Sequence, residues 1–210
     1  MLTPGISKQT LRRLPFYLSY LKSLRKDMPE YISATAIADA LKLNQVQVRK
    51  DLAFVSSSGR PKVGYKTQDL ICEIESFLGY DETDNAIIVG AGKLGKALMN
   101  YAGFQEYGLN ILAAFDANAD LVNSETSDKP IMPMEQLKDF CLGLKIRIGI
   151  ITVPSDHAQE VCDALVGSGV LAIWNFAPVH LRVPEYIIVQ NENMASSLAI
   201  LSNHLNQKLK

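Results

Sequence analysis

The sequence lacks any uninterrupted apolar run of about 18 residues, the length from which a membrane-spanning helix is recognised. We therefore expect no membrane partner, and residues 1–5 lack the layout of a secretory signal. Cysteine is scarce: only Cys72, Cys141 and Cys162 occur, with no Cys-x-x-Cys pair. An odd number of cysteines without metal-ligand spacing predicts reduced thiols, no metal site and a cytoplasmic location.

A recognisable set of reacting groups is also missing. The three histidines, His157, His180 and His204, have no nucleophile or metal ligand at motif spacing. Nucleophilic and acid–base catalysis both need such a partner within hydrogen-bond reach. We therefore expect no catalytic residue and no enzyme.

The net charge of −1 conceals an uneven distribution of charge along the chain. Residues 1–70 contain 12 Lys and Arg against 5 Asp and Glu, a balance of +7, whereas residues 71–210 contain 9 against 17, a balance of −8. A basic segment joined to an acidic body predicts that the first part meets a polyanion such as nucleic acid.

Five leucines at helical spacing predict an amphipathic helix over about residues 8–27. Pro15 interrupts this pattern. Because proline lacks a backbone N–H and is tolerated in the first turn of a helix, we expect the regular helix to begin near residue 14.

Two short helices separated by a tight turn follow. Ser33 is a plausible N-cap for the first, which ends at Leu41, and the second spans residues 45–55. The second helix buries one face and turns four polar side chains outward: Gln45, Gln47, Arg49 and Lys50. This arrangement predicts a helix-turn-helix reader of the DNA major groove. The alternative is a dimerisation or docking module with a solvated polar face.

The next segment is rich in serine and glycine and spans residues 56–65. It fits a β-hairpin wing in which Arg60 or Lys62 enters a narrow minor groove. A flexible linker is the alternative for residues 56–58. A helix over residues 67–79 then leads to a domain boundary that we place at residue 80.

The second part of the chain begins with an apolar run and a glycine cluster, Gly90-Ala91-Gly92-Lys93-Leu94-Gly95. In such a motif the first glycine allows a tight turn, the second lets a pyrophosphate approach the backbone, and the third lets helix and strand pack closely. The helix that follows directs its free amides at the phosphates. The alternative is a glycine-rich turn in an unrelated α/β domain.

A second apolar run ends at Asp116, where an acid binds the ribose 2′-hydroxyl of NAD. No arginine follows to accept the 2′-phosphate of NADP. These residues favour NAD(H) as the cofactor.

Strands and helices alternate between residues 81 and 192, with further strands expected at 146–152, 170–174 and 187–189. This order predicts an α/β fold with a doubly wound, Rossmann-type parallel sheet. Ligands bind beyond the carboxyl ends of its strands. We therefore add to the cofactor site Thr152, Val153, Pro154, Asn175, Phe176 and Ala177. Tyr101, just past the helix that follows the glycine cluster, is a candidate to form a hydrogen bond near the nicotinamide end, with core packing as the alternative.

Residues 193–210 form the last expected helix. Met194, Leu198, Leu201 and Leu205 repeat at steps of four, three and four, a narrow seam that packs helix on helix. Because DNA readers of this kind work as dimers on paired half-sites, we expect this helix to reach a second copy of the chain. The alternative is that it packs on the sheet of its own chain.

The whole chain resembles the Rex family of redox-sensing transcriptional repressors. The resembling segments are Gln47-Val48-Arg49-Lys50-Asp51-Leu52, Val63-Gly64-Tyr65, Val89 to Leu98, Asn100-Tyr101-x-Gly103-Phe104, Ala114-Phe115-Asp116, Thr152-Val153-Pro154 and Asn175-Phe176-Ala177-Pro178. The resemblance implies a winged-helix DNA-binding domain at 1–80, a Rossmann NAD(H) domain at 81–192 and a C-terminal helix at 193–210 exchanged in a homodimer. It also implies repression when NAD⁺ is plentiful and release from operator DNA when NADH binds.

Three departures from the family pattern stand out. The family's wing usually reads aromatic-Phe-Gly-Ser-aromatic-Gly-Thr-Arg-Gly, which residues 54–62 do not match. Ser19 and Asn193 occupy positions where some members pair an arginine with the partner's aspartate. Met194 replaces a phenylalanine near the nicotinamide and offers no flat face. Two alternatives follow: a divergent member that binds DNA without NADH control, and a small NAD-dependent oxidoreductase with an N-terminal docking module.

Overall fold

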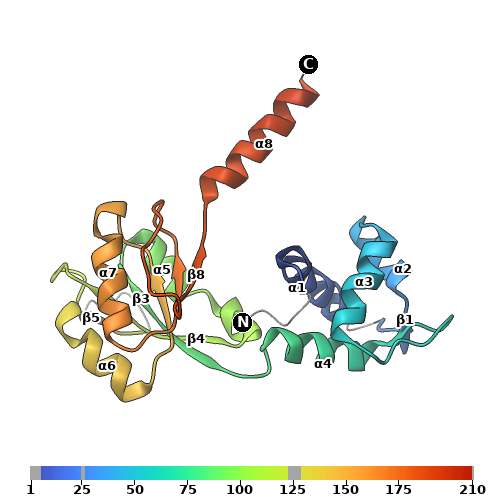
Figure 1. Cartoon of the computed structure of the whole chain (residues 1–210), viewed down its shortest axis with the longest axis horizontal. Helices are drawn as coiled ribbons and strands as arrows, with labels where there is room; N and C mark the ends of the chain where they lie inside the picture. The colour runs from blue at the N-terminus through green and yellow to red at the C-terminus, as the bar shows by residue number, and fades with distance from the viewer. Residues whose placement is uncertain (1–5, 25–26, 123–128, 210) are drawn as a thin grey trace. The chain divides into compact units, whose positions relative to one another are not determined.

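The computed structural model describes residues 6–24, 27–122 and 129–209 (Figure 1). Contacts divide the chain into two compact units, Met1–Glu82 and Thr83–Lys210, and the C-terminal helix falls within the second. The expectation about a secretory signal concerns residues 1–5, which lie outside the described residues. Among the residues described, no helix has both the length and the apolarity to cross a bilayer.

The first unit is a bundle of four helices with a two-stranded antiparallel sheet. In chain order its elements are α1 (Lys8–Ser23), β1 (Tyr31–Ile32), α2 (Ala34–Leu41), α3 (Gln45–Val55), β2 (Tyr65–Lys66) and α4 (Thr67–Leu78). Ser33 caps α2 by accepting a hydrogen bond from the Ala36 N–H, and Asn44 caps α3 in the same way. The helix pair expected from the sequence is therefore present, with each N-terminus satisfied by a short polar side chain.

The first helix begins earlier than the sequence suggested. Ser7 Oγ accepts a hydrogen bond from the Thr10 N–H at 3.0 Å and caps α1 at Lys8, so Pro15 lies inside the helix. The expectation of a regular start near residue 14 is wrong. A proline in a helix interior removes one hydrogen bond. The helix continues through it because Leu14 and Leu18, on either side, are fully buried in the core of this unit.

The segment after α3 closes in a tight loop. Arg60 and Gly64 exchange two backbone hydrogen bonds, of 2.8 and 2.9 Å, and form a single bridge instead of a long hairpin. Between them Lys62 adopts a φ of +65°, the left-handed region that favours glycine. The usual family wing carries a glycine at this position, where this chain has a lysine.

The second unit contains one six-stranded sheet, in the order β5-β4-β3-β6-β7-β8, in which every described pair is parallel. Its strands are β3 (Asp84–Val89), β4 (Leu109–Asp116), β5 (Ile131–Pro133), β6 (Ile148–Ile151), β7 (Ala172–Asn175) and β8 (Ile188–Asn191). The connecting helices are α5 (Lys93–Met99), η1 (Ala102–Tyr107), η2 (Met134–Gln136), α6 (Leu137–Leu144) and α7 (Ser155–Gly167). This is the doubly wound order of a Rossmann sheet, with the connections changing direction between β3 and β6.

Two of these elements were not expected from the sequence. The strand β5 has only three residues and ends at a proline, too short for an alternating pattern to show. The short 3₁₀ helix η1 lies between the first helix and the second strand of the sheet, where the sequence shows no helical pattern. The polar residues 123–128 that precede β5 lie outside the described residues.

The C-terminal helix α8 (Met194–Lys208) has no buried residue. Asn193 caps it by accepting a hydrogen bond from the Ser196 N–H at 3.0 Å. Its apolar side chains, including Leu198, Leu201 and Leu205, are each more than half exposed. Within the described chain this seam packs on nothing, which leaves it available to another surface.

Candidate functional site

The glycine motif forms the turn between β3 and α5. Gly90 has a φ of +103°, and a Cβ there would lie 2.9 Å from Val153 Cγ1. A Cβ on Gly95 would lie 1.9 Å from the Gly90 carbonyl oxygen. Gly92 differs, because a Cβ there would meet no atom within 4 Å. Packing therefore requires two of the three glycines, while the third faces open space that a ligand can enter.

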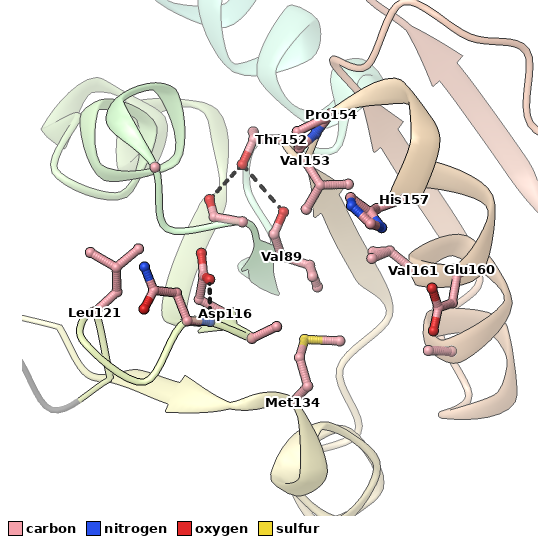
Figure 2. Close-up of a pocket in the computed structure, with 15 residues that line it drawn as sticks. Val89, Asp116, Leu121, Met134, Thr152, Val153, Pro154, His157, Glu160 and Val161 are labelled. Atoms are coloured by element: carbon pink, nitrogen blue, oxygen red, sulfur yellow. Dashed lines mark hydrogen bonds between the residues drawn. The ribbon is translucent and has the colours of Figure 1, made fainter.

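Thr152, which follows β6, holds this turn in place. Its hydroxyl donates to the Gly90 carbonyl at 2.7 Å and lies 3.2 Å from that of Val89, as the dashed lines in Figure 2 show. The two strands that flank the change of direction in the sheet are thus tied at their carboxyl ends. The sequence placed Thr152 in the cofactor site, and the structure gives it this supporting contact.

Asp116 ends β4 beside the same turn. One carboxylate oxygen accepts from the Ala91 N–H at 2.6 Å, and the other accepts from the Asn118 N–H at 2.8 Å. These bonds orient the carboxylate at the rim of the cleft, and each oxygen keeps further acceptor capacity. The Ala91 amide is occupied by this bond. The N-terminal amides of α5, at Lys93 and Leu94, have no side-chain cap.

A cleft of about 500 Å³ opens at this edge of the sheet. Six predicted residues line it: Gly90, Gly92, Asp116, Thr152, Val153 and Pro154. In Figure 2, Val153 and His157 lie across the cleft from Asp116 and Leu121. The structure thus brings the glycine loop, the strand-end acid and the residues after β6 into one cleft.

Sequence reasoning missed the contribution of α7 to this cleft. His157, Glu160, Val161 and Ala164 line it from one face of that helix. These residues are spaced by three, one and three positions, which is the spacing of one face of a helix. This pattern in the segment after Pro154 could have identified them from the sequence. His157 and Glu160 place two ionisable groups beside the cleft.

Two further predicted cofactor residues, Tyr101 and Phe176, belong to an aromatic group beyond the lining of this cleft. Tyr101, Phe104, Trp174 and Phe176 make successive ring contacts with centroids 4.9, 5.6 and 4.9 Å apart. Asn175 is fully buried and uses its amide to donate to Ala177, Val179 and Asn191. Asn175 therefore shapes the loop after β7, and Met194, at the start of α8, is two-thirds exposed.

The four polar residues predicted to read DNA are all exposed on α3. Gln45 donates to Asp39 at 3.2 Å, and Gln47 donates to Asp51 at 2.9 Å. Arg49, Arg60 and Lys62 line a shared hollow of about 470 Å³ beside the N-terminus of α2. Three cations from α3 and the loop therefore meet in one concave, positively charged surface.

An ion pair between Arg13 and the buried carboxylate of Asp51 fixes α3 on α1. Arg13 contacts both carboxylate oxygens of Asp51, at 2.7 and 2.9 Å, and the Tyr17 hydroxyl donates to the same carboxylate at 2.7 Å. Burial raises the pKa of Tyr17 to about 12, helped by its bond to Asp51. This network was not visible in the sequence, because Arg13 and Asp51 are 38 residues apart.

The cysteines show no metal-binding arrangement. Burial raises the pKa of Cys141 and of Cys162 to about 11, and Cys72 is exposed. Among the residues that the structure covers, no group of three or more His, Cys, Asp or Glu side chains is placed to hold a metal ion.

Two family models match the chain. One described as "CoA binding domain" matches residues 81–179, and one described as "Putative DNA-binding protein N-terminus" matches residues 5–53. A redox-sensing transcriptional repressor Rex of Treponema denticola is 44% identical over 95% of both chains. The Rex of Bacteroides fragilis is 40% identical over 96% of this chain and 91% of its own.

Solved structures give the same result. A protein described as RSP in complex with β-NAD⁺ and operator DNA superposes with a TM-score of 0.91, at 37% identity over 98% of this chain and 95% of that one. RSP in complex with β-NADH gives a TM-score of 0.87 at 36% identity, over 98% and 97% of the two chains. With identities of this size over nearly the full length, the chain belongs to the Rex family of redox-sensing transcriptional repressors.

Proposed function

We propose that this chain is a repressor whose binding to operator DNA responds to the NADH/NAD⁺ ratio. One observation carries the proposal: a relative that matches 98% of this chain was solved with NAD⁺ and operator DNA together. The two units supply surfaces of the matching chemistry. A repressor of this kind acts on the cell's own DNA, so we place it in the cytoplasm.

The glycine turn supports the cofactor half of this proposal. Gly92 leaves room for a pyrophosphate, and the amides of Lys93 and Leu94 point from the start of α5 without a side-chain cap. Asp116 can accept hydrogen bonds from the ribose hydroxyls. Bound NAD(H) supplies the redox state that is read. The protein's own residues bind and orient it, and none of them has to transfer a proton.

The remaining cofactor residues are proposed at the nicotinamide end. Tyr101, Phe176 and Ala177 belong to the aromatic group and to the loop that Asn175 shapes. Met194 would reach this end from α8 and fill volume through a flexible thioether. The exposed seam of α8 supports a homodimer in which each copy covers the other's helix.

The cationic hollow supports the DNA half. Gln45, Gln47, Arg49 and Lys50 lie on a helix of the size that enters the major groove, with its N-terminal residues toward the bases. Arg60 and Lys62 extend the positive surface onto the loop. In this arrangement glutamines read base edges, while lysines neutralise phosphates.

The experiment that tests the proposal measures both ligands on the same preparation. Wild-type protein should bind NADH and should also bind one DNA duplex in preference to duplexes of other sequence. Gly92→Ala should fold normally, because its Cβ has open space, yet lose NADH affinity by about tenfold or more if one backbone contact to a charged phosphate is blocked. Wild-type protein that binds neither nicotinamide form, or a Gly92→Ala variant that binds NADH normally, would contradict the cofactor assignment.

A second candidate is a family member that binds DNA without NADH control. Asn193 and Ser19 favour it, because neither side chain carries a charge. The Asn193 side chain is used to cap α8, and the Ser19 side chain is exposed. The charged latch of some relatives therefore has no counterpart in these two residues. DNA binding that is insensitive to saturating NADH, in a protein shown to bind NADH, would select this candidate.

A further inference from the structure

The side-chain amide of Gln47 is oriented by a hydrogen bond to the buried carboxylate of Asp51. Gln47 is the third residue of α3, it is exposed, and its Nε2 donates to Asp51 Oδ1 over 2.9 Å. Residues at the start of a recognition helix are those that reach base edges. The orientation of this amide therefore decides which of its atoms meets the DNA.

Asp51 can only accept hydrogen bonds in this setting. Burial alone would raise the pKa of Asp51, but bonds from Arg13, Tyr17 and Gln47 outweigh burial and leave the pKa below its usual value. An ionised carboxylate has no proton to donate. Turning the amide over would set Gln47 Oε1 against Asp51 Oδ1 and replace an attraction by a repulsion.

The carboxylate is itself prevented from turning. Arg13 Nε donates to Oδ2 at 2.7 Å and Nη2 to Oδ1 at 2.9 Å, and the Tyr17 hydroxyl donates to Oδ2 at 2.7 Å. With the bond from Gln47, each oxygen accepts twice, which fills a carboxylate's accepting positions. The Asp51 side chain is only 1% exposed. Helix α1 thus fixes the carboxylate, and the carboxylate fixes the amide.

We propose that Gln47 determines operator specificity by reading an amino-bearing base in the major groove, and that Asp51 is its positioning residue. Held in this way, the amide turns Oε1 outward, an acceptor for adenine N6 or cytosine N4. An unrestrained glutamine can rotate to put its NH₂ group in the place of Oε1 and donate to the keto oxygen of guanine or thymine, whereas the held one keeps Oε1 in that place. The inference rests on the proposed DNA-binding function.

The test uses the full-length chain and a synthetic duplex that wild-type protein selects from a randomised pool. Each base pair of one half-site is replaced in turn, and the affinity of each duplex is measured. We expect one position at which wild-type protein prefers adenine or cytosine by about 5- to 150-fold, the range of one good base contact. At that position Gln47→Ala should show no preference between amino and keto bases.

The matched control is Gln159→Ala in α7. Gln159 donates to Asp163 at 2.8 Å across one helical turn, the same arrangement as Gln47 and Asp51, but in the second unit. Its loss should leave the ranking of bases unchanged. A ranking that changes equally in both glutamine variants would show a non-specific effect and would overturn the inference.

Asp51→Asn tests the positioning role. The new amide can donate to Gln47 Oε1 and let the glutamine turn its NH₂ group outward, so guanine or thymine should become accepted at the same position. If circular dichroism shows that this variant does not fold, the Gln47→Ala duplex panel decides alone. The inference is overturned if wild-type protein binds its operator with no preference for an amino-bearing base, or if Gln47→Ala keeps that preference. Either result leaves the proposed function standing. Failure to select any duplex overturns the proposed function itself.

Discussion

The two functional surfaces of this chain are built by opposite means. The cleft of the second unit is shaped by backbone: Gly90 and Gly95 let a turn and a helix approach closely, and Thr152 ties that turn to the next strand. The proposed DNA-binding surface of the first unit is shaped by side chains, with α3 fixed by the ion pair of Arg13 with the buried Asp51. The cleft should therefore be sensitive to added atoms, and the proposed DNA-binding surface to lost charges.

Gly95→Ala should have the largest effect. Its Cβ would lie 1.9 Å from a backbone oxygen that cannot move without breaking the turn. The free energy of unfolding of the second unit should therefore fall by at least ~3 kcal/mol, the upper end of the usual cost of overpacking. Thermal unfolding measures this. Gly143→Ala is the control, because its Cβ meets nothing within 4 Å. A Gly95→Ala variant that melts like wild type would refute a cleft dominated by backbone packing.

Arg13→Ala should destabilise the first unit by about 3–5 kcal/mol, because it leaves the buried Asp51 carboxylate without its cation. Denaturant unfolding of the full chain, followed by a probe in the first unit, gives the value. Lys22→Ala removes another cation of α1, one that pairs with Glu75. The Glu75 side chain is 28% exposed, whereas that of Asp51 is 1% exposed, so we expect less than ~1 kcal/mol. Equal costs for the two variants would remove the special role of the ion pair with the buried Asp51.

Alkali should weaken the first unit through Tyr17. The pKa of Tyr17 is raised from its ordinary value of 10.0 to about 12, so its contribution is complete below pH 10 and is lost as the pH rises through 12. Two pKa units correspond to about 2–3 kcal/mol. Between pH 10 and 12 the free energy of unfolding should fall more steeply with pH for wild type than for Tyr17→Phe. Parallel curves for the two proteins would show that Tyr17 does not titrate in this way.

The smallest expected effect concerns Lys50. If its ammonium group neutralises one phosphate, Lys50→Ala should reduce the slope of log affinity against log salt by about 0.9. Lys138→Ala, an exposed lysine of α6 in the second unit, is the matched control and should leave the slope unchanged. An unaltered slope in Lys50→Ala would remove this residue from the DNA interface.

The same contrast explains what the sequence predicted. The glycine turn and Asp116 were predicted because their requirement is local, since Gly90 and Gly95 make close contacts with an adjacent strand end and within the motif. The pairing of Arg13 with Asp51 joins two helices distant in the chain, and charged residues at such positions look like any solvated pair. The helix start was predicted wrongly because Pro15 was expected near the first turn. The burial of Leu14 and Leu18 on either side outweighs the one hydrogen bond that proline removes.

Local patterns also have limits of their own. The strand β5 is too short to show periodicity, and the hydrogen bonds that the Asn175 amide makes within the protein cannot be read from the sequence. The face of α7 that lines the cleft was present in the sequence as helical spacing. Neither a single histidine nor a single glutamate stands out until the fold places both beside the glycine turn.

The central claim is that a dinucleotide held by the second unit controls DNA binding by the first. The most direct measurement titrates NADH, and separately NAD⁺, into the complex of full-length protein with its selected duplex and follows release by fluorescence anisotropy. We predict that NADH releases the duplex and that the duplex weakens NADH binding by the same factor, as linkage requires. A duplex affinity that is identical with and without saturating NADH would contradict the claim.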